Sequence, residues 1–344
     1  MSKDKIKVLV VDDSLLFREL LKEGLAQQTD FRVVGAAADP YEARDKILAL
    51  RPDVVTLDVE MPRMDGIKFL RTLMPQYPVP VVVITFLDAS VFEALDAGAV
   101  DFVVKPAGQG MEEGFLADVA QKVRIAAQVT FAYRRSRPEQ RITLTPLGLG
   151  GPADPRKVVA IGASTGGTEA IHSMLSKFSA DMPGMVICQH MPAGFTKLYA
   201  DRLNATCALE VKEAEDGDAL FPGRVLLAPG GLQMRLMRGA GGEYRVRCIE
   251  GPRVSGHAPS VDVLFESVAQ TAGKDAVGVI LTGMGTDGSV GLKKIREAGG
   301  YTLGQDEKSS VVYGMPMAAY LSGAVMQQLP LYRLPDELIR VLKR

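Results

Sequence analysis

Short apolar segments alternate with amphipathic segments twice along this chain, before and after a stretch rich in proline and glycine. In the first half, the apolar segments are rich in valine and isoleucine and span residues 6–11, 32–36, 54–57, 81–85 and 102–104. The amphipathic segments have helical spacing and cover residues 15–28, 41–50, 67–74, 91–97 and 115–129. Continuous apolar runs are typical of strands that are buried on both faces. Residues 1–127 are therefore predicted to form a five-stranded, doubly wound parallel sheet with helices on both faces.

The second half repeats the alternation with longer gaps. Its candidate parallel strands are 157–161, 184–189, 224–228 and 277–281, its candidate helices are 168–177, 260–272 and 289–298, and a hairpin is indicated by 233–237 and 243–249. This pattern predicts a second, three-layer α/β domain over residues 157–344 with a mainly parallel sheet. Residues 128–156 have proline and glycine punctuation and no usable period, which is typical of a linker.

The charge distribution argues against nucleic acid as a partner. Residues 1–127 contain 15 basic and 20 acidic residues, the linker 5 and 2, and residues 157–344 contain 20 and 19, so no region has a strong positive charge. Arg134, Arg135 and Arg137 form one short cluster without interleaved aromatic residues, which favours a solvated tether. The second half has no helix-turn-helix signal, so a transcriptional output is not favoured.

The cysteines and the apolar runs indicate a cytoplasmic protein. Cys188, Cys207 and Cys248 have no paired spacing, so neither a zinc site nor a disulfide framework is predicted, and we expect small buried side chains in a reducing compartment. The N-terminus does not have the pattern of a signal peptide, and no apolar run reaches the roughly 20 residues that span a bilayer. Direct membrane insertion is not expected.

Acidic residues lie at the predicted strand ends of the first domain. Asp12 and Asp13 close the first strand and Asp58 the third, while Thr85 and Lys105 end the fourth and fifth. Any one aspartate could simply cap a helix. Three carboxylates that converge at one sheet edge repel one another unless they hold a hard cation, and Mg²⁺ suits such oxygen ligands. The cation and Lys105 would neutralise a phosphoryl group that arrives on Asp58.

Ser164 is the candidate nucleophile of the second domain. It lies in the sequence Gly-Ala-Ser-Thr-Gly-Gly at 162–167, between a predicted strand and a predicted helix. A serine hydroxyl needs an imidazole base, and the chain has three histidines. His190 ends the strand 184–189 and lies beside Ser164 if consecutive strands pair, so it is the favoured base. His257, in a loop, and His172, in the following helix, are the alternatives.

Asp287 is the candidate acid that orients the base. It lies in the glycine-rich segment 282–288 after a predicted strand, although it could also cap the helix that begins near Ser289. An α/β-hydrolase carries its acid before its histidine, so the order Ser164, His190, Asp287 disfavours that fold. The glycines at 162–167 lack the Lys-Ser/Thr end of a phosphate-binding loop, so no cofactor is expected for this domain.

The first domain resembles a bacterial response-regulator receiver domain. The residues that carry the resemblance are Asp12-Asp13, Asp58, the sequence Met-Pro-Arg-Met-Asp-Gly at 61–66, Thr85, Phe102 and Lys105-Pro106. The resemblance implies that Asp58 accepts the phosphoryl group and that Mg²⁺ is held by Asp12, Asp13, Asp58 and the backbone carbonyl of Glu60. It also implies a set of switch residues, namely Thr85, Phe102 and Lys105.

The second domain resembles the catalytic domain of the bacterial chemotaxis protein-glutamate methylesterases, the CheB family. The matching segments are 162–167, Gln-His-Met-Pro at 189–192, Leu-Ala-Pro-Gly at 227–230, Pro-Ser-Val-Asp at 259–262, 281–288, Gln-Asp-Glu at 305–307 and Tyr-Gly-Met-Pro at 313–316. Because the receiver and the linker occur in the same order, the resemblance spans essentially the whole chain.

This second resemblance implies a reaction and its partners. The expected substrates are glutamate γ-methyl esters on the cytoplasmic helices of methyl-accepting chemoreceptors, with deamidation of particular glutamines, and the expected phosphodonor is the chemotaxis histidine kinase. Ser164 would attack the carbonyl, His190 would transfer the proton, and water would release the acyl-enzyme. The backbone N–H groups of Thr165 and Met284 are the candidate oxyanion donors.

Two positions depart from the family pattern, and one rival function stays open. Gln233 and Ala258 stand where many relatives have histidine and arginine, and we expect both to contact the substrate and to affect receptor preference and deamidation. The domain order suggests that the unphosphorylated receiver covers the edge that carries Ser164 and that a phosphoryl group on Asp58 weakens this inhibition. The rival is a phosphorylation-gated interaction module without turnover, which predicts that Ser164→Ala leaves the function intact.

Overall fold

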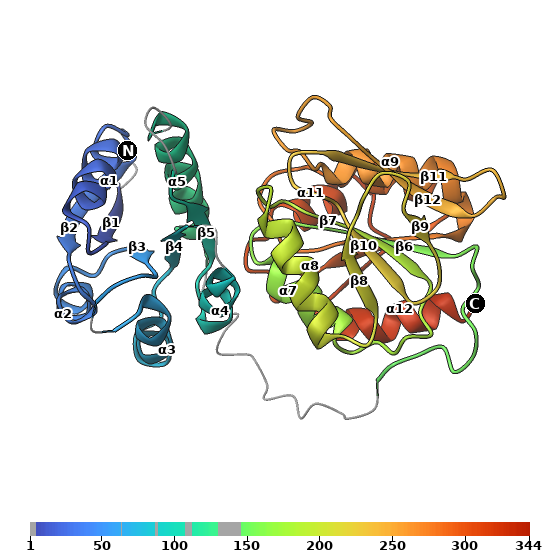
Figure 1. Cartoon of the computed structure of the whole chain (residues 1–344), viewed down its shortest axis with the longest axis horizontal. Coiled ribbons are helices and arrows are strands. Elements are labelled where there is room, and N and C mark those ends of the chain that lie inside the picture. Colours follow the sequence, from blue (N-terminus) through green and yellow to red (C-terminus); the bar gives the residue numbers. More distant parts are fainter. Residues whose placement is uncertain (1–4, 63, 87–88, 107–111, 130–145) are drawn as a thin grey trace. The chain divides into compact units, whose positions relative to one another are not determined.

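The computed structural model describes residues 5–62, 64–86, 89–106, 112–129 and 146–344. The chain divides into two compact units, Met1–Phe131 and Ala132–Arg344 (Figure 1). The linker arginines Arg134, Arg135 and Arg137 and the motif residue Arg63 lie outside the described residues. Among the described residues, none of the helices combines the length and the apolar character that a membrane span requires.

The first unit is a parallel sheet between two layers of helices. Its strands are β1 (Ile6–Val11), β2 (Phe31–Ala37), β3 (Val54–Asp58), β4 (Val81–Thr85) and β5 (Asp101–Val104), and its helices are α1 (Leu15–Ala26), α2 (Pro40–Leu50), α3 (Gly66–Gln76), α4 (Ser90–Ala97) and α5 (Glu112–Ala126). The strand order is β2-β1-β3-β4-β5, and all neighbours are parallel. Helices α1 and α5 cover one face and α2, α3 and α4 the other (Figure 1). The predicted five-stranded, doubly wound sheet is confirmed.

Two aspartates of this unit cap helices and are distinct from the aspartates at the strand ends. The Asp39 carboxylate accepts hydrogen bonds from the backbone N–H groups of Tyr41 and Glu42 at the start of α2. The Asp65 carboxylate accepts one from the N–H of Lys68 in the first turn of α3. Each cap satisfies backbone donors that the helix itself leaves unpaired.

The second unit contains a larger parallel sheet and a small antiparallel one. Its strands are β6 (Val158–Ala163), β7 (Gly184–Gln189), β8 (Glu210–Glu213), β9 (Ala219–Leu220), β10 (Arg224–Leu227), β11 (Gln233–Arg238), β12 (Tyr244–Ile249), β13 (Ala276–Ile280), β14 (Tyr301–Gln305) and β15 (Gln327–Leu329). Its helices are α7 (Gly167–Leu175), α8 (Phe195–Thr206), α9 (Val261–Ala272), α10 (Ser289–Glu297), α11 (Met315–Leu321) and α12 (Leu334–Leu342), with 3₁₀ turns η1 (Gly273–Asp275) and η2 (Leu331–Arg333).

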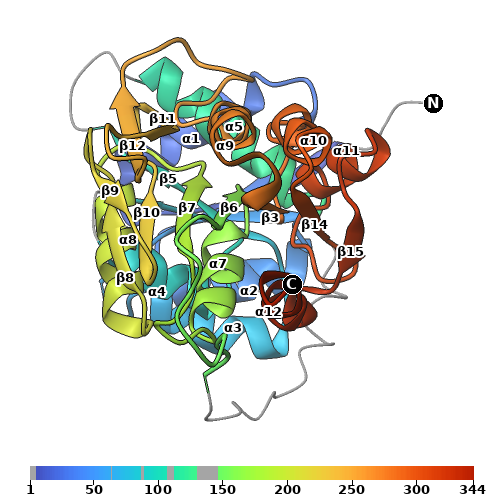
Figure 2. The same ribbon diagram turned by 90° about the vertical axis from the view of Figure 1, so that its right-hand side faces the viewer.

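The seven-stranded sheet has the order β15-β14-β13-β6-β7-β10-β8, and every neighbouring pair is parallel. Helices α9, α10 and α11 lie on one face, and α7 and α12 lie on the other (Figure 2). The predicted hairpin is formed by β11 and β12. Strand β12 also pairs with β9, so these three strands make a separate antiparallel sheet. The three-layer α/β prediction is confirmed, although strands β8, β9, β14 and β15 and helices α8, α11 and α12 were not predicted.

Residues 147–156, which were expected to belong to the linker, form hydrogen bonds with the rest of the second unit. The N–H of Leu147 donates to the carbonyl of Lys177 at 2.6 Å, and the Leu147 carbonyl accepts from the N–H of Ser179 at 2.9 Å. The Tyr244 hydroxyl donates to the carbonyl of Arg156 at 2.7 Å. These contacts attach this segment to the larger domain.

Candidate active site

Ser164, His190 and Asp287 are brought to the same edge of the seven-stranded sheet. Strand β6 lies between β7 and β13, and its last residue, Ala163, pairs with Gln189 at the end of β7. Ser164 follows β6 and His190 follows β7, so the predicted pairing of consecutive strands is confirmed. Asp287 lies on the loop after β13. All three loops leave the carboxyl ends of adjacent parallel strands, where ligand sites of such sheets are found.

The turn that carries Ser164 is tight. The N–H of Ser164 donates to the carbonyl of Thr282 at 3.0 Å, and the N–H of Gly167 donates to the carbonyl of Ser164 at 2.7 Å. Gly166 has a φ of 76°, which strains any residue with a side chain, and a Cβ there would lie 2.6 Å from Cβ of Val311. The glycine therefore lets the chain turn directly from the strand into α7 after the serine.

His190 and Asp287 form a buried hydrogen bond. His190 Nε2 lies 2.8 Å from Asp287 Oδ2, and the two side chains are 6% and 2% exposed. An ionised carboxylate can only accept, so Nε2 carries a proton, and in the neutral imidazole Nδ1 then keeps its lone pair. His190 Nδ1 is buried and has no hydrogen-bond partner among the described residues, Ser164 included. Nδ1 is therefore the atom available to take a proton.

The Asp287 carboxylate lies at the first turn of α9. It accepts five hydrogen bonds, from His190 Nε2 at 2.8 Å, Ser260 Oγ at 2.8 Å, and the N–H groups of Val261 at 2.8 Å, Asp262 at 3.0 Å and Gly288 at 3.1 Å. Burial acts to raise the pKa of Asp287, but the hydrogen bond from His190 and those from these backbone donors outweigh it and hold the pKa at about 2. Helix α10 begins without a side-chain cap. Asp287 therefore binds His190 and the first N–H groups of α9. It does not act as the side-chain cap of α10, which was the alternative for this residue in the sequence analysis.

The other two histidines occupy different places. His172 lies within α7. The ring of His257 stacks on the ring of His190, with centroids 3.6 Å apart and planes 10° apart. Of these histidines, His190 is the one paired with Asp287. Sequence reasoning missed the stacked arrangement, because no spacing in the sequence indicates that a loop histidine covers one at a strand end.

The candidate oxyanion donors lie on the two loops that meet at the serine. The Thr165 carbonyl accepts a hydrogen bond from Thr282 Oγ1 at 3.0 Å, which joins the Ser164 turn to the loop after β13. A Cβ on Gly283 would lie 2.7 Å from Cβ of Ser164, so Met284 directly follows a residue that packs against the serine. The oxyanion role of the Thr165 and Met284 N–H groups stays a prediction.

Gln233 was expected from the sequence to contact the substrate, but its side chain is buried and paired with backbone groups. Its side chain is 4% exposed. Its Nε2 donates to the carbonyls of Pro252 at 3.0 Å and His257 at 3.1 Å, and its Oε1 accepts from the N–H of Ser260 at 2.9 Å. An amide that pairs with backbone groups can be buried at low cost, so these bonds give Gln233 a structural role, and its contact with the substrate stays a prediction. Ala258 is half-buried, and its role stays a prediction.

The acidic cluster of the first unit is assembled at the strand ends. One oxygen from each of Asp12, Asp13 and Asp58 lies within 4.8 Å of the others, and Asp13 is exposed while the other two are buried. Lys105 Nζ lies 2.9 Å from Asp12 Oδ2 and 2.7 Å from Asp58 Oδ2. The N–H of Glu60 donates to Asp58 Oδ1 at 3.2 Å. An all-oxygen donor set with one exposed member fits Mg²⁺, which keeps several of its waters.

Burial changes the acidity of this cluster. It raises the pKa of Asp58 to about 6, although the hydrogen bond and the charge of Lys105 act in the opposite direction. For Lys105, burial acts to lower the pKa, but Asp58 and Asp12 outweigh it, so the pKa is raised and the amine stays charged. The candidate switch residues Thr85 and Phe102 are both buried, and Thr85 Oγ1 has no hydrogen-bond partner among the described residues.

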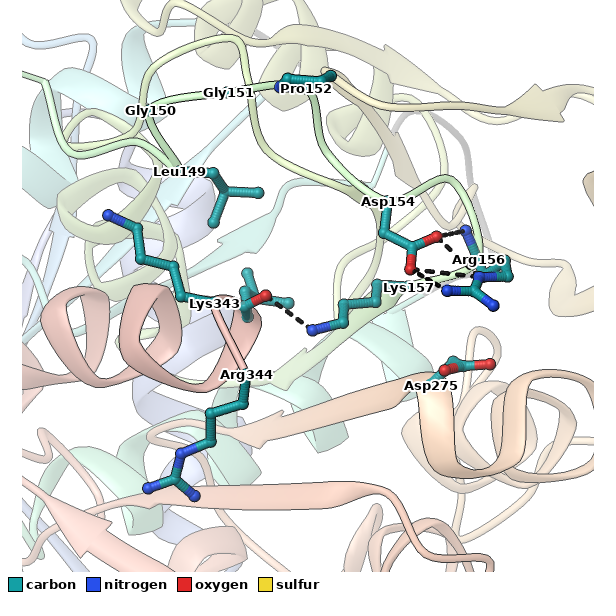
Figure 3. A pocket seen from close by; sticks show the side chains of 11 residues that line it. Leu149, Gly150, Gly151, Pro152, Asp154, Arg156, Lys157, Asp275, Lys343 and Arg344 are labelled. Atoms are coloured by element: carbon teal, nitrogen blue, oxygen red, sulfur yellow. Dashed lines mark hydrogen bonds and ion pairs between the residues drawn. The ribbon is translucent and has the colours of Figure 1, made fainter.

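A separate hollow lies at the opposite end of β6 (Figure 3). Lys157, which precedes β6, lines it and donates from Nζ to the carbonyl of Leu342 at 2.7 Å. Arg156 and Asp154 form an ion pair of 2.7 Å on its rim. Because Ser164 follows the other end of β6, this hollow is not part of the candidate active site.

Comparisons with known proteins agree over both units. Residues 159–338 match the family model described as CheB methylesterase, and residues 8–111 match the response regulator receiver domain. The protein-glutamate methylesterase/protein-glutamine glutaminase 2 of Syntrophomonas wolfei subsp. wolfei is 53% identical over 342 residues, which cover 99% of this chain and 98% of that relative. The protein-glutamate methylesterase/protein-glutamine glutaminase of Syntrophotalea carbinolica is 51% identical over 349 residues, which cover 98% of each.

A solved structure supports the same assignment for the second unit. The Thermotoga maritima CheB methylesterase catalytic domain matches with a TM-score of 0.52 and 36% identity, over 54% of this chain and 98% of that chain. The resemblance inferred from the sequence is therefore confirmed. The chain belongs to the CheB methylesterase family and carries a response-regulator receiver domain ahead of the catalytic domain.

Proposed function

We propose that this protein hydrolyses glutamate γ-methyl esters on the cytoplasmic helices of methyl-accepting chemoreceptors and deamidates particular glutamines there, and so serves adaptation in bacterial chemotaxis. The observation that carries the proposal is the buried hydrogen bond between His190 and Asp287 at the sheet edge where Ser164 lies. The relatives that match over nearly the whole chain are named for both reactions.

The proposed reaction passes through an acyl-enzyme. Ser164 Oγ attacks the side-chain carbonyl carbon and gives its proton to Nδ1 of His190, while Asp287 stabilises the imidazolium through Nε2. The tetrahedral intermediate then expels methanol, or ammonia from glutamine, which leaves with the proton from His190. Water attacks the acyl-enzyme with His190 again as base, and the product is a glutamate carboxylate. The N–H groups of Thr165 and Met284 would stabilise the oxyanion.

The first unit would gate this reaction through phosphorylation. We propose that a chemotaxis histidine kinase phosphorylates Asp58 and that Mg²⁺ is held by Asp12, Asp13, Asp58 and the carbonyl of Glu60. When bound, Mg²⁺ supplies positive charge that offsets the charge of the phosphoryl oxygens. Lys105, which contacts Asp58 and Asp12, would bind the phosphoryl group. Thr85 and Phe102 would transmit the change and relieve inhibition of the esterase.

The test is methanol release from methyl-labelled receptor membranes, with and without a small phosphodonor. We expect the phosphodonor to raise the rate for the wild type and not for Asp58→Asn. Ser164→Ala should bind the receptor and release no methanol. Methanol release by Ser164→Ala at the wild-type rate would contradict the mechanism. An intact cellular function of that variant would instead favour the interaction module without turnover.

A further inference from the structure

The base of the proposed mechanism is restrained at more than one place. The hydrogen bond from Nε2 to Asp287 fixes one atom of the His190 ring, and a ring held at a single atom can still tilt about it. The ring of His257 lies against one face at 3.6 Å and nearly parallel, at 10°. A stacking contact restrains the plane of a ring, whereas a hydrogen bond restrains the position of one atom. The two contacts together therefore determine the orientation of the imidazole.

His257 is itself held by a tight turn. Val254 and His257 exchange two backbone hydrogen bonds, of 2.9 and 3.0 Å, across the residues Ser255 and Gly256. Both central residues have left-handed backbone conformations, with φ of 51° and 84°. This is the pattern of the two-residue turns that match the twist of a hairpin. The turn presents the ring of His257 from a rigid piece of backbone.

Gln233 ties this turn to the other partner of His190. Its Nε2 donates to the His257 carbonyl, and its Oε1 accepts from the N–H of Ser260, three residues later. Ser260 Oγ in turn donates to Asp287 Oδ1 at 2.8 Å. Both ends of the segment 257–260 are therefore held by hydrogen bonds. His257, at one end, stacks on the face of the His190 ring, and Ser260, at the other end, bonds to Asp287, whose carboxylate binds the edge of that ring.

We infer that His257 is a positioning residue for the esterase reaction. It acts through His190, by holding the imidazole in the plane in which Nε2 meets Asp287 and Nδ1 stays available to the Ser164 hydroxyl. This inference rests on the proposed function. Small losses of alignment of a catalytic group lower turnover strongly while ground-state binding is retained, so His257 should affect kcat rather than KM.

The test compares His257→Ala with His257→Phe in the full-length protein. The alanine variant removes the stack, and we expect kcat for methanol release to fall by about 10- to 100-fold with KM little changed. The phenylalanine variant keeps a flat ring but has no titratable nitrogen, and it should restore kcat to within about threefold of the wild type. A phenylalanine variant as slow as the alanine variant would overturn the inference, because it would give the imidazole of His257 a chemical role. Wild-type kcat in the alanine variant would overturn it too.

A second readout does not depend on turnover. The chain has three histidines, so ¹⁵N-histidine NMR gives a small set of ring signals that single variants assign. In the wild type and in His257→Phe, we expect one His190 tautomer, with the proton on Nε2. In His257→Ala, the His190 signals should broaden or become those of mixed tautomers. An unchanged, single His190 tautomer in the alanine variant would contradict the positioning role.

His172→Gln is the matched control, because His172 lies in the same domain but on α7. It should keep wild-type kcat and leave the His190 signals unchanged. The failure of the proposed function can be told apart from the failure of this inference. If the wild type releases no methanol, the function fails, while the NMR comparison still decides whether the stack orients His190.

Discussion

Asp287 has two roles at the level of a single residue, since its carboxylate orients His190 and also receives the first N–H groups of α9. For Asp287→Asn we predict a fall in kcat of about 10³- to 10⁴-fold, because an amide can hold the wrong tautomer of the imidazole. The lost charge-assisted bonds should also lower the free energy of unfolding by about 1–3 kcal/mol. Stopped-flow or steady-state methanol release and urea unfolding measure the two effects.

Asp262 gives the control for this prediction. Its carboxylate lies one residue into the same helix, accepts from the N–H of Gly291 at 2.7 Å and interacts with the Asp287 carboxyl, and the hydrogen bond to His190 comes from Asp287. Burial raises the pKa of Asp262 to about 6, and the charge of Asp287 acts in the same direction. If Asp262→Asn lost as much activity as Asp287→Asn, the carboxylate bonded to His190 would not be the one that matters.

The raised pKa of Asp58 predicts a pH-dependent metal affinity. The carboxyl titrates at about 6 in the folded protein and near 3.9 when unfolded, so the metal-free fold binds this proton preferentially and loses stability as pH rises from about 4 to about 6. Mg²⁺ must displace the same proton. Its affinity, measured by calorimetry on the full chain, should therefore rise between about pH 5 and 7 and level off above. Asp58→Asn should remove most of that slope, and an equal slope in this variant would contradict the assignment.

The residues of the candidate site were partly predictable from the sequence. Ser164, His190 and Asp287 follow strands with clear apolar runs, so their common edge could be inferred from strand order. The stack of His257 on His190 could not, because it depends on the 254–257 turn and on the buried amide of Gln233. The sequence does not show that backbone groups of two loops will form hydrogen bonds with the side-chain amide of a glutamine at the start of a strand.

At the scale of elements, the loop after β13 is packed against the serine turn with no spare room. A Cβ on Gly283 would lie 2.7 Å from Cβ of Ser164 and 2.4 Å from Sδ of Met315. The methionine can move, but the serine is held by its N–H bond to Thr282. We therefore predict that Gly283→Ala displaces Ser164 and lowers kcat by about 10²-fold with a smaller effect on KM. Gly151→Ala, where a Cβ would meet nothing within 4 Å, is the control. Equal activity of the two variants would contradict the close approach.

Three of the strands that the sequence did not predict, β8, β14 and β15, share a physical cause. Strand β14 (Tyr301–Gln305) is short and contains glycine and glutamine, so it lacks an apolar run. Gln305 is nevertheless buried, because its Oε1 accepts from the N–H of Thr282 and its Nε2 donates to the carbonyl of Ser309. Strands β8 and β15 lie at the two edges of the sheet, and each has a single buried residue, Val211 and Leu329 respectively. Tertiary contacts rather than local pattern determine these strands.

At the scale of the whole molecule, the segment 147–156 decides where the catalytic unit begins. Leu147 pairs with the chain at Lys177 and Ser179, and the N–H of Gly150 donates to Asp181 Oδ2 at 2.9 Å. A fragment that starts at residue 157 would lose these bonds and the contact of Arg156 with Tyr244. A fragment of residues 146–344 keeps them and is the appropriate form in which to examine the esterase without its receiver.

That fragment tests the proposed inhibition. If the unphosphorylated receiver limits access to Ser164, residues 146–344 should release methanol at least as fast as the unphosphorylated full chain and should not respond to a phosphodonor. The full chain with phosphodonor should approach or exceed the rate of the fragment, and Asp58→Asn should stay at the unphosphorylated rate. The measurement is initial methanol release at equal concentrations, with circular dichroism to verify that the fragment is folded. A folded fragment far slower than the unphosphorylated full chain would mean that the receiver contributes to activity directly, because removing a cover alone cannot slow the reaction.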